Sequence, residues 1–294
     1  MNVAVLLCAY NGEKYIRAQL DSIASQELKP IVVYVYDWGS TDETVNIVKL
    51  FKAETDLTCE LIRKDKPIGV AAGFKVGIQE LLASSYNFGY IALCDQDDIW
   101  LSSKLFEYKQ VIDSKSSVDM VFSDVSVINA DGEILIESRN NSSPYFTPKL
   151  DVFDESVIFA NPVVGMTIMV SRKLASTYAS STFDFEFMHD WSLVLICYFM
   201  KLDSYYVDKP LVQYRQHSNN ILGNQSTKPK IALLLSMPNR IKNIVNQYNA
   251  ISLNFPNGKE FSYAYYLKKI PNLKVIKPTY KVVLLFFLMW NMIF

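Results

Sequence analysis

Strand and helix patterns alternate along the first hundred residues, and this alternation most constrains the fold. Short apolar or β-branched runs, typical of buried strands, occupy residues 3–8, 31–36, 61–63 and 90–94. Segments with the apolar spacing of amphipathic helices lie between them, at residues 15–23, 40–51 and 69–82. Strands that are joined through helices pair in parallel. We therefore expect an α/β fold with a mostly parallel central sheet flanked by helices.

Polar side chains follow three of these strands at the point where each strand ends. Tyr10 and Asn11 follow the first strand, Asp37 the second and residues 95–98 the fourth. Because ligands of such sheets bind beyond the carboxyl ends of the strands, these groups are expected to converge on one crevice. The chain has neither GxGxxG nor GxxxxGK[ST], so neither a dinucleotide fingerprint nor a P-loop accounts for the crevice.

The acidic run Asp95-Gln96-Asp97-Asp98 is the sharpest local feature. Its carboxylates repel one another unless a cation offsets them, and Mg²⁺ or Mn²⁺ prefers oxygen ligands of this kind. In an extended stretch, Asp95 and Asp97 would face the same side. The alternative is a solvated turn in which Asp98 caps a helix.

The rest of the chain shows weaker patterns. Strands are expected at residues 120–128, 165–170, 205–207 and 211–214, and helices from Arg172, over the apolar run 193–200 and at 231–248, where Pro238 interrupts the pattern. Ser40, followed by Glu43, has the spacing of a capping box at the start of a helix. The four cysteines show no metal-ligand spacing, which is typical of small buried residues in a reducing compartment.

Five segments of this sequence occur in an order that is typical of one enzyme family. They are AVLLCAYNGEKYIRAQLDSIASQ, YVYDWGSTDETVNIV, CDQDDIW, HDWSLVL and YRQHSNN. In this order they resemble the motifs of family 2 glycosyltransferases with the GT-A fold, especially bacterial polysaccharide rhamnosyltransferases. The resemblance covers roughly residues 1–223 and implies a GT-A nucleotide-diphospho-sugar transferase domain there. Residues 224–294 would form a basic, helical, membrane-associating C-terminal extension.

The resemblance implies that five residues bind the nucleotide sugar. Ala9 and Tyr10 would line the base pocket, and Asp37 would hold the base or the ribose. Asp95, the first acid of the DXD motif, would lie beside the ribose. Arg215 would contact phosphate.

Three further residues would carry the metal and the chemistry. By resemblance, Asp97 would bind the Mn²⁺ or Mg²⁺ that bridges the diphosphate, and His217 would complete the metal shell. Asp190 would be the general base that takes the proton of the acceptor hydroxyl, a role that suits a positioned carboxylate. On local sequence alone, Asp190 could instead cap the helix that follows it, and His217 could be a satisfied polar residue.

Two positions depart from the family pattern. Trp38 stands where the family usually has a second Asp that contacts the base, so Trp38 would stack on the base instead or the nucleotide would be held less tightly. Gly73 stands where an Asn often precedes Phe74. Neither position is the proposed general base or a proposed metal ligand.

The end of the chain is basic and then apolar. Val212 to Phe294 contains eleven Lys and Arg residues and one acid, Glu260. The final run VVLLFFLMWNMIF is shorter than the ~20 apolar residues that a spanning helix needs. Basic residues followed by an apolar, Trp-bearing run suit an anionic membrane surface better than nucleic acid. The alternative is a core helix that closes the fold.

Together these features predict an inverting, metal-dependent hexosyltransferase of family 2. The resemblance alone implies that it would move L-rhamnose from dTDP-L-rhamnose, or next a hexose from a UDP-sugar, to a lipid-linked saccharide acceptor of a bacterial capsule or cell-wall polysaccharide. The enzyme would be cytoplasmic and peripherally attached to the inner face of the cell membrane, because the N-terminus has the pattern of a strand and not of a signal peptide. The alternatives are a sugar-phosphate nucleotidyltransferase and a non-catalytic scaffold of a polysaccharide assembly.

Overall fold

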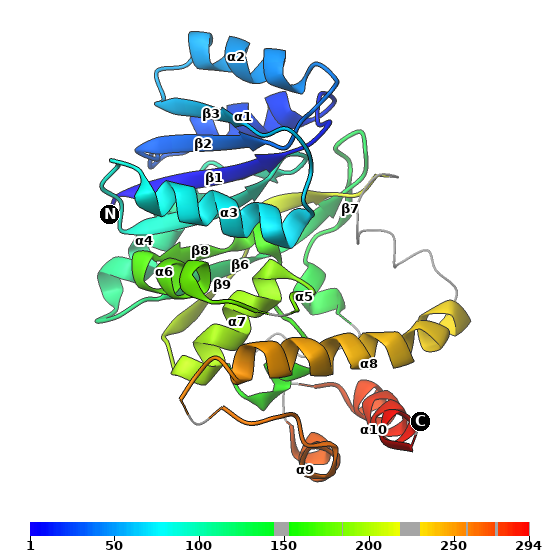
Figure 1. Cartoon of the computed structure of the whole chain (residues 1–294). Helices are drawn as coiled ribbons and strands as arrows, with labels where there is room; N and C mark the ends of the chain where they lie inside the picture. Colours follow the sequence, from blue (N-terminus) through cyan, green and yellow to red (C-terminus); the bar gives the residue numbers. More distant parts are fainter. Residues whose placement is uncertain (144–152, 184, 218–229, 257, 274–275, 294) are drawn as a thin grey trace.

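A mixed sheet forms the centre of the molecule. The computed structural model describes residues 1–294 except 144–152, 184, 218–229, 257, 274–275 and 294 (Figure 1). Within these residues nine strands join in the order β3-β2-β1-β4-β8-β6-β9-β5, with β7 paired to β6. Their bounds are β1 Val3–Ala9, β2 Val32–Asp37, β3 Cys59–Arg63, β4 Tyr90–Asp95, β5 Ile99–Trp100, β6 Met120–Ile128, β7 Ile134–Ile136, β8 Met169–Ser171 and β9 Ser204–Arg215.

The sheet is mostly parallel, as predicted. Strands β1 to β4 pair in parallel with one another, and β6 pairs in parallel with β9. Strand β8 runs antiparallel between β4 and β6, so that these two strands point the same way. The carboxyl ends of β1, β2, β4, β6 and β9 therefore lie at one edge of the sheet, which is where the predicted site residues are.

Helices cover both faces of the sheet. Helices α1 (Ile16–Ala24), α2 (Thr44–Glu54) and α4 (Lys104–Ser114) pack on the face that carries Val5 and Leu7 of β1. Helices α3 (Val70–Ala83), α6 (Arg172–Ser180) and α7 (His189–Met200) pack on the face that carries Leu6. The alternation of these three apolar residues between the faces is what a doubly covered strand requires.

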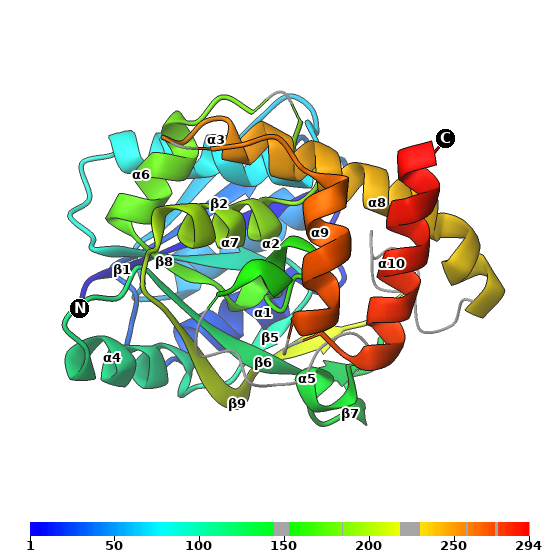
Figure 2. The same cartoon turned by 90° about the horizontal axis from the view of Figure 1, so that it is seen from below.

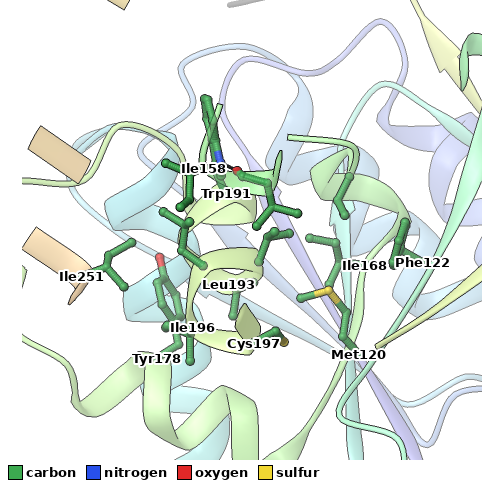
Figure 3. Packing of buried hydrophobic residues seen from close by; sticks show 14 of the residues in the cluster. Met120, Phe122, Ile158, Ile168, Tyr178, Trp191, Leu193, Ile196, Cys197 and Ile251 are labelled. Carbon is green, nitrogen blue, oxygen red and sulfur yellow. Dashed lines mark hydrogen bonds between the residues drawn. The ribbon is translucent and has the colours of Figure 1, made fainter. Parts of the chain in front are cut away.

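The C-terminal helices share the core of the α3–α6–α7 face. Helices α8 (Lys230–Ser252), α9 (Tyr263–Lys269) and α10 (Pro278–Ile293) lie at the end of the molecule opposite α2 (Figures 1 and 2). Ile251 of α8 belongs to the same cluster as Trp191 and Ile196 of α7 (Figure 3). Helix α8 runs through Pro238 without a break. In the described part of the chain, no helix combines the length and the apolar character that crossing a membrane requires.

Three local predictions were wrong. Helix α2 begins at Thr44, whose amide donates to the Asp42 carboxylate, and Ser40 therefore forms no capping box. Residues 165–170 split into a 3₁₀ turn, η2 (Gly165–Thr167), and the short strand β8. The two strands expected between residues 205 and 214 are one strand, β9, whose register against β6 shifts near Pro210. A bulge of this kind interrupts the alternation of side chains and makes one strand look like two.

Candidate active site

The turns after β1 and β2 are joined by side-chain-to-backbone hydrogen bonds. The backbone amide of Asn11 donates to the Ser40 hydroxyl at 2.9 Å, and the backbone amide of Thr41 donates to the Asn11 side-chain oxygen Oδ1 at 2.9 Å. Asn11 has a φ of 49°, a left-handed conformation that Asn tolerates better than most residues. The reciprocal bonds hold the two strand ends together as one rim.

The predicted base-binding residues lie on this rim. Ala9 is buried opposite Asp37 in the β1–β2 register, and the Tyr10 side chain is 45% exposed. The Asp37 carboxylate is fully buried, accepts the Ser40 amide at 3.2 Å and lies 3.7 Å from Arg63 Nε. The structure thus places a buried carboxylate and an exposed aromatic residue at the ends of two neighbouring strands, while their contacts with a nucleotide remain predictions.

Gln96 belongs to the acidic loop, residues 95–98, and connects this loop to the rim. No role was predicted for it from the sequence. Its side chain accepts the Tyr10 amide at 2.9 Å and donates to the Tyr10 carbonyl at 3.0 Å. A Cβ on Gly12 would lie 2.2 Å from Gln96 Oε1, so the glycine is needed for this approach. A glutamine between two aspartates and a glycine after Asn11 were the only signals available in the sequence.

The two residues predicted to bind metal are in direct contact. His217 Nε2 and Asp97 Oδ2 lie 2.8 Å apart, although they are far apart in the sequence. Arg215, at the end of β9, donates from Nε to the Asp97 carbonyl and from its backbone amide to Asp98 Oδ1, each at 2.9 Å. These bonds show that Arg215 fixes the backbone of the acidic loop. A phosphate contact of Arg215 remains a prediction.

The Asp97–His217 pair fits a divalent ion that takes few protein ligands. Among the described residues, no group of three or more His, Cys, Asp or Glu side chains is arranged to hold a metal. Mg²⁺ is commonly bound by one or two protein ligands together with substrate phosphates, and Mn²⁺ accepts both oxygen and imidazole ligands. One carboxylate oxygen beside one imidazole nitrogen therefore suits a site that the donor diphosphate completes.

Asp98, the last residue of the acidic loop, is buried and does not cap a helix. Its side chain is buried, and burial together with the charges of Asp97 and Asp95 raises its pKa well above the usual value. Lys104 of α4 is fully buried close by, donates to the Met166 carbonyl at 2.9 Å and lies 3.4 Å from the centre of the Trp100 ring. The alternative of a solvated acidic turn is therefore wrong for this chain.

Asp190 lies in the first turn of α7. Its buried carboxylate accepts the Trp191 amide at 2.7 Å, and burial raises its pKa to about 6. The pKa of Asp95 is also raised, first by burial and then by the charges of Asp97 and Asp190. The charge of Asp190 therefore acts on Asp95. That Asp190 shares one site with Asp97 and His217 stays a prediction.

Comparison with known proteins identifies the family of this chain. Residues 4–163 match the family model described as "Glycosyl transferase family 2". The chain belongs to this family. It is 29% identical over 235 residues to the dTDP-rhamnosyl transferase RfbG of Shigella flexneri, an alignment that covers 76% of each chain.

Solved structures of low sequence identity share the fold of this family 2 glycosyltransferase. S. aureus TarS 1-349 in complex with UDP-GlcNAc aligns with a TM-score of 0.57 and 18% identity, covering 86% of this chain and 71% of TarS 1-349. Glucosyl-3-phosphoglycerate synthase from Mycobacterium tuberculosis, in complex with Mg²⁺ and UDP, aligns with a TM-score of 0.52 and 17% identity, covering 80% of this chain and 78% of the synthase. The predicted GT-A fold with a helical C-terminal region is confirmed.

The two departures from the family pattern are neighbours in space. Trp38 is only 7% exposed, and its Nε1 lies 3.1 Å from where a Cβ on Gly73 would be. Its ring also stacks on Tyr36 at 6.4 Å. An indole buried in this way offers no open face to a nucleotide base, so we assign Trp38 to packing in this glycosyltransferase.

Two residues near Asp190 shape its surroundings. His189 stacks on Phe74 at 4.2 Å, and burial lowers its pKa to about 3, so it is neutral and structural. Arg139, in the short helix α5 (Arg139–Ser142), lies near enough to lower the pKa of Asp190. No role was predicted for Arg139 from the sequence, because nothing in its local pattern links it to Asp190.

Proposed function

We propose that this family 2 enzyme transfers a sugar with inversion from a nucleoside diphosphate to a saccharide acceptor of a bacterial surface polysaccharide. The observation that carries the proposal is the contact between Asp97 and His217 beyond the carboxyl ends of β4 and β9, and the charge of Asp190 acts on the neighbouring Asp95. We propose L-rhamnose from dTDP-L-rhamnose as the first donor, supported by the similarity to RfbG over 76% of the chain, and UDP-hexoses as the next.

The rim and the acidic loop would bind the donor. We assign Ala9, Tyr10 and Asp37 to the base and ribose, and Asp95 to the ribose. The assignment is supported by the rim of hydrogen bonds that fixes the β1 and β2 turns, because a rigid pocket loses little entropy when it binds a nucleotide. Arg215 would contribute positive charge on the diphosphate side while its backbone bonds hold the loop.

A divalent metal would be held by Asp97 and His217. Structures with the same fold have been solved with Mn²⁺, as in the mannosyltransferase PcManGT of Pyrobaculum calidifontis, or with Mg²⁺. When bound, the ion supplies positive charge that stabilises the leaving diphosphate. The contact between Asp97 and His217 supports their assignment as the two protein ligands.

Asp190 would act as the general base. The acceptor oxygen forms a bond to the anomeric carbon while the bond from that carbon to the diphosphate oxygen breaks, and the hydroxyl proton passes to the Asp190 carboxylate. A positioned base contributes typically ~10²–10⁴-fold to the rate. Its pKa of about 6 leaves Asp190 ionised at neutral pH and yet more basic than an exposed carboxylate. A single displacement inverts the anomeric configuration.

The C-terminal region would attach the enzyme to an anionic membrane surface. One side of α10 exposes apolar side chains, including Val282 at 67% and Phe286 at 54%, whereas Leu284 and Leu288 are buried on its other side. Exposed Lys242 and Lys268 lie on the neighbouring helices. Apolar side chains beside lysines are typical of interfacial helices. This attachment would place the site at the inner face of the membrane, near a lipid-linked acceptor.

A donor panel tests the proposal. The purified chain would be incubated with Mn²⁺ and dTDP-L-rhamnose, UDP-glucose, UDP-galactose or UDP-N-acetylglucosamine, with thermal shift and nucleotide release as readouts. We expect dTDP-L-rhamnose to raise the melting temperature and to release dTDP, and both effects to be lost with EDTA. When a saccharide acceptor is added, NMR should show a glycoside whose anomeric configuration is inverted relative to that of the donor.

The alternatives predict different results from the same protein. Pyrophosphate release from dTTP and a sugar 1-phosphate would indicate a nucleotidyltransferase. A chain that neither binds nor turns over any donor of the panel would be a scaffold, and the proposed function would be wrong.

A further inference from the structure

A glutamine of the C-terminal region contacts the segment that presents Asp190. Gln247 Oε1 in α8 accepts the backbone amides of Phe187 and Met188 at 3.0 and 3.2 Å. The Gln247 side chain is 2% exposed, so these bonds are shielded from water. Gln247 lies outside residues 4–163, which the family model matches, and sequence reasoning gave it no role.

The two amides lie where helix α7 begins. Met188 is the N-cap residue of α7, and its side chain makes no capping hydrogen bond. Amides at a helix start have no partner within the helix and need one from elsewhere. The Met188 carbonyl accepts the Ser192 amide at 3.0 Å and so begins the helical ladder around the turn that contains Asp190. By fixing the Met188 peptide, Gln247 fixes the direction in which α7 starts.

The rest of this turn is held from the catalytic part of the chain. His189 stacks on Phe74 of α3, and Trp191 Nε1 donates to the Val157 carbonyl at 2.6 Å. Gly165 approaches so closely that a Cβ there would lie 2.9 Å from His189 Nε2. Gln247 adds a contact from helix α8, and the turn is thereby enclosed on several sides.

Helix α8 is itself fixed where Gln247 projects. Tyr248 packs edge-to-face on Phe199 of α7 at 5.4 Å and on Tyr266 of α9 at 5.9 Å. Ile244 and Ile251, three before and four after Gln247, are buried in the shared core. Gln247 therefore projects from a rigid support and can transmit the position of the C-terminal helices to α7.

We propose that Gln247 is a positioning residue for Asp190, and that the C-terminal helical region is part of the catalytic unit as well as an attachment region. The inference rests on the proposed function, because it takes Asp190 as the base. A displacement of about 1 Å at a reacting group can cost as much as ~10²-fold in rate. Loss of the Gln247 bonds should therefore lower kcat and leave donor binding at β1, β2 and β4 nearly unchanged.

Helix α8 offers a matched control for the test. Asn249 Oδ1 accepts the Phe261 amide at 2.6 Å, a bond of the same kind that leads to the C-terminal region and not to α7. Gln247→Met and Asn249→Leu each replace an amide by an apolar group of similar size. With dTDP-L-rhamnose, or the panel donor that the wild-type chain uses, we expect Gln247→Met to lower kcat by roughly tenfold or more and to change the donor KM by less than about threefold. Asn249→Leu should change neither by more than about threefold.

A rescue variant separates positioning from general destabilisation. Gln247 Nε2 is buried without a hydrogen-bond partner among the described residues, so Gln247→Glu keeps the acceptor and loses no bond. We expect this variant, assayed at pH 8, to retain most of the wild-type kcat. Equal kcat for Gln247→Met and Asn249→Leu would overturn the inference, as would a Gln247→Glu variant as slow as Gln247→Met.

Hydrogen exchange provides a readout that does not depend on transfer. Gln247→Met should speed exchange of the Phe187 and Met188 amides, and Asn249→Leu that of the Phe261 amide. Unchanged exchange at residues 187 and 188 would refute the positioning contact even in a chain with no activity. A wild-type chain that turns over no donor would instead refute the proposed function, so the two failures are distinguishable.

Discussion

At the scale of single residues, the burial of Asp190 links the chemistry of the site to its stability. Its folded pKa of about 6 lies above the usual 3.8 because burial disfavours the charged form. The folded state thus binds a proton more readily than the unfolded state. The destabilisation of the folded state by the charged Asp190 is fully present above pH 6 and disappears as the pH falls toward 4.

Asp190→Asn should therefore abolish transfer and stabilise the fold at the same time. Removing the buried charge should gain about 3 kcal/mol at pH 8, or roughly 5–10 °C in melting temperature, and almost nothing at pH 4. Donor affinity should stay within about threefold of wild type, and the wild-type kcat should fall as the pH drops below about 6.

Melting curves and donor titrations from pH 4 to pH 8 check this prediction, with the exposed Asp56→Asn as the control. If donor binding were lost together with transfer, Asp190 would not be the base. A stabilisation that is equal at pH 4 and pH 8 would contradict the account of its burial.

The sequence pointed to candidate residues with recognisable chemistry and gave no sign of those whose contacts are hydrogen bonds to distant backbone atoms. The order of the motifs was enough to bring Asp97 and His217 together, and the structure places them in contact. Gln96 and Gln247 carry no charge, and their partners are backbone atoms of distant segments. No pattern of side chains in the sequence reveals a backbone partner, so such residues were not predictable.

At the scale of elements, the pairing of Trp38 with Gly73 couples the β2 turn to helix α3. A side chain at position 73 would meet the indole at 3.1 Å, closer than ordinary van der Waals contact. Overpacking of this kind usually costs about 1–3 kcal/mol. The two departures from the family pattern therefore compensate each other sterically, which the sequence could not show because the positions lie on different elements.

Gly73→Asn should thus destabilise the wild-type chain more than it destabilises a Trp38→Ala variant. We expect a coupling energy of about 1 kcal/mol or more between the two positions, because residues in contact rarely behave additively. Urea unfolding of both single variants and of the double variant measures the coupling. Ala72→Asn, at an exposed position of the same helix, should cost the same in both backgrounds. A coupling near zero would show that Trp38 moves aside without cost.

Helices and strands were predicted correctly where the hydrophobic pattern extends over many residues. They were predicted wrongly where the local backbone conformation determines the structure. Strand β6 has the residues expected for it, Met120–Ile128, and α3 begins directly after Gly69. Turn η2 and the β9 bulge were missed. Gly165 has no side chain and therefore lets the backbone approach His189 closely, and the register of β9 against β6 shifts near Pro210. Neither cause alters the hydrophobic pattern in a way that can be read from the sequence.

At the scale of the whole molecule, the C-terminal region packs into the catalytic part and also exposes an apolar face. Tyr280 of α10 is buried and donates to the Phe159 carbonyl, and Leu284 and Leu288 belong to the shared core. The interpretation as a core helix is thus confirmed for one side of α10, whereas the membrane interpretation concerns the exposed side and stays a prediction. Deleting the helix would expose that core, so a test of membrane binding must change only the outer side.

The outer side of α10 should govern binding to anionic membranes. Val282, Phe286 and Trp290 lie four residues apart and are exposed. Each apolar side chain of this size contributes about 1.5–3 kcal/mol when it is removed from water. Replacing all three by serine should lower vesicle affinity by more than about tenfold without lowering the melting temperature. Binding should also weaken with added salt, because lysines contribute to it.

Flotation of the full chain with vesicles of phosphatidylglycerol and phosphatidylcholine measures this affinity. The control replaces an exposed apolar residue elsewhere, Leu50 on α2, by serine. We expect the control to float like the wild type, because α2 lies at the opposite end of the molecule from α10 (Figure 1). Equal flotation of the α10 variant and the control would mean that the outer side of α10 does not face lipid, and the exposed helix would then need another partner.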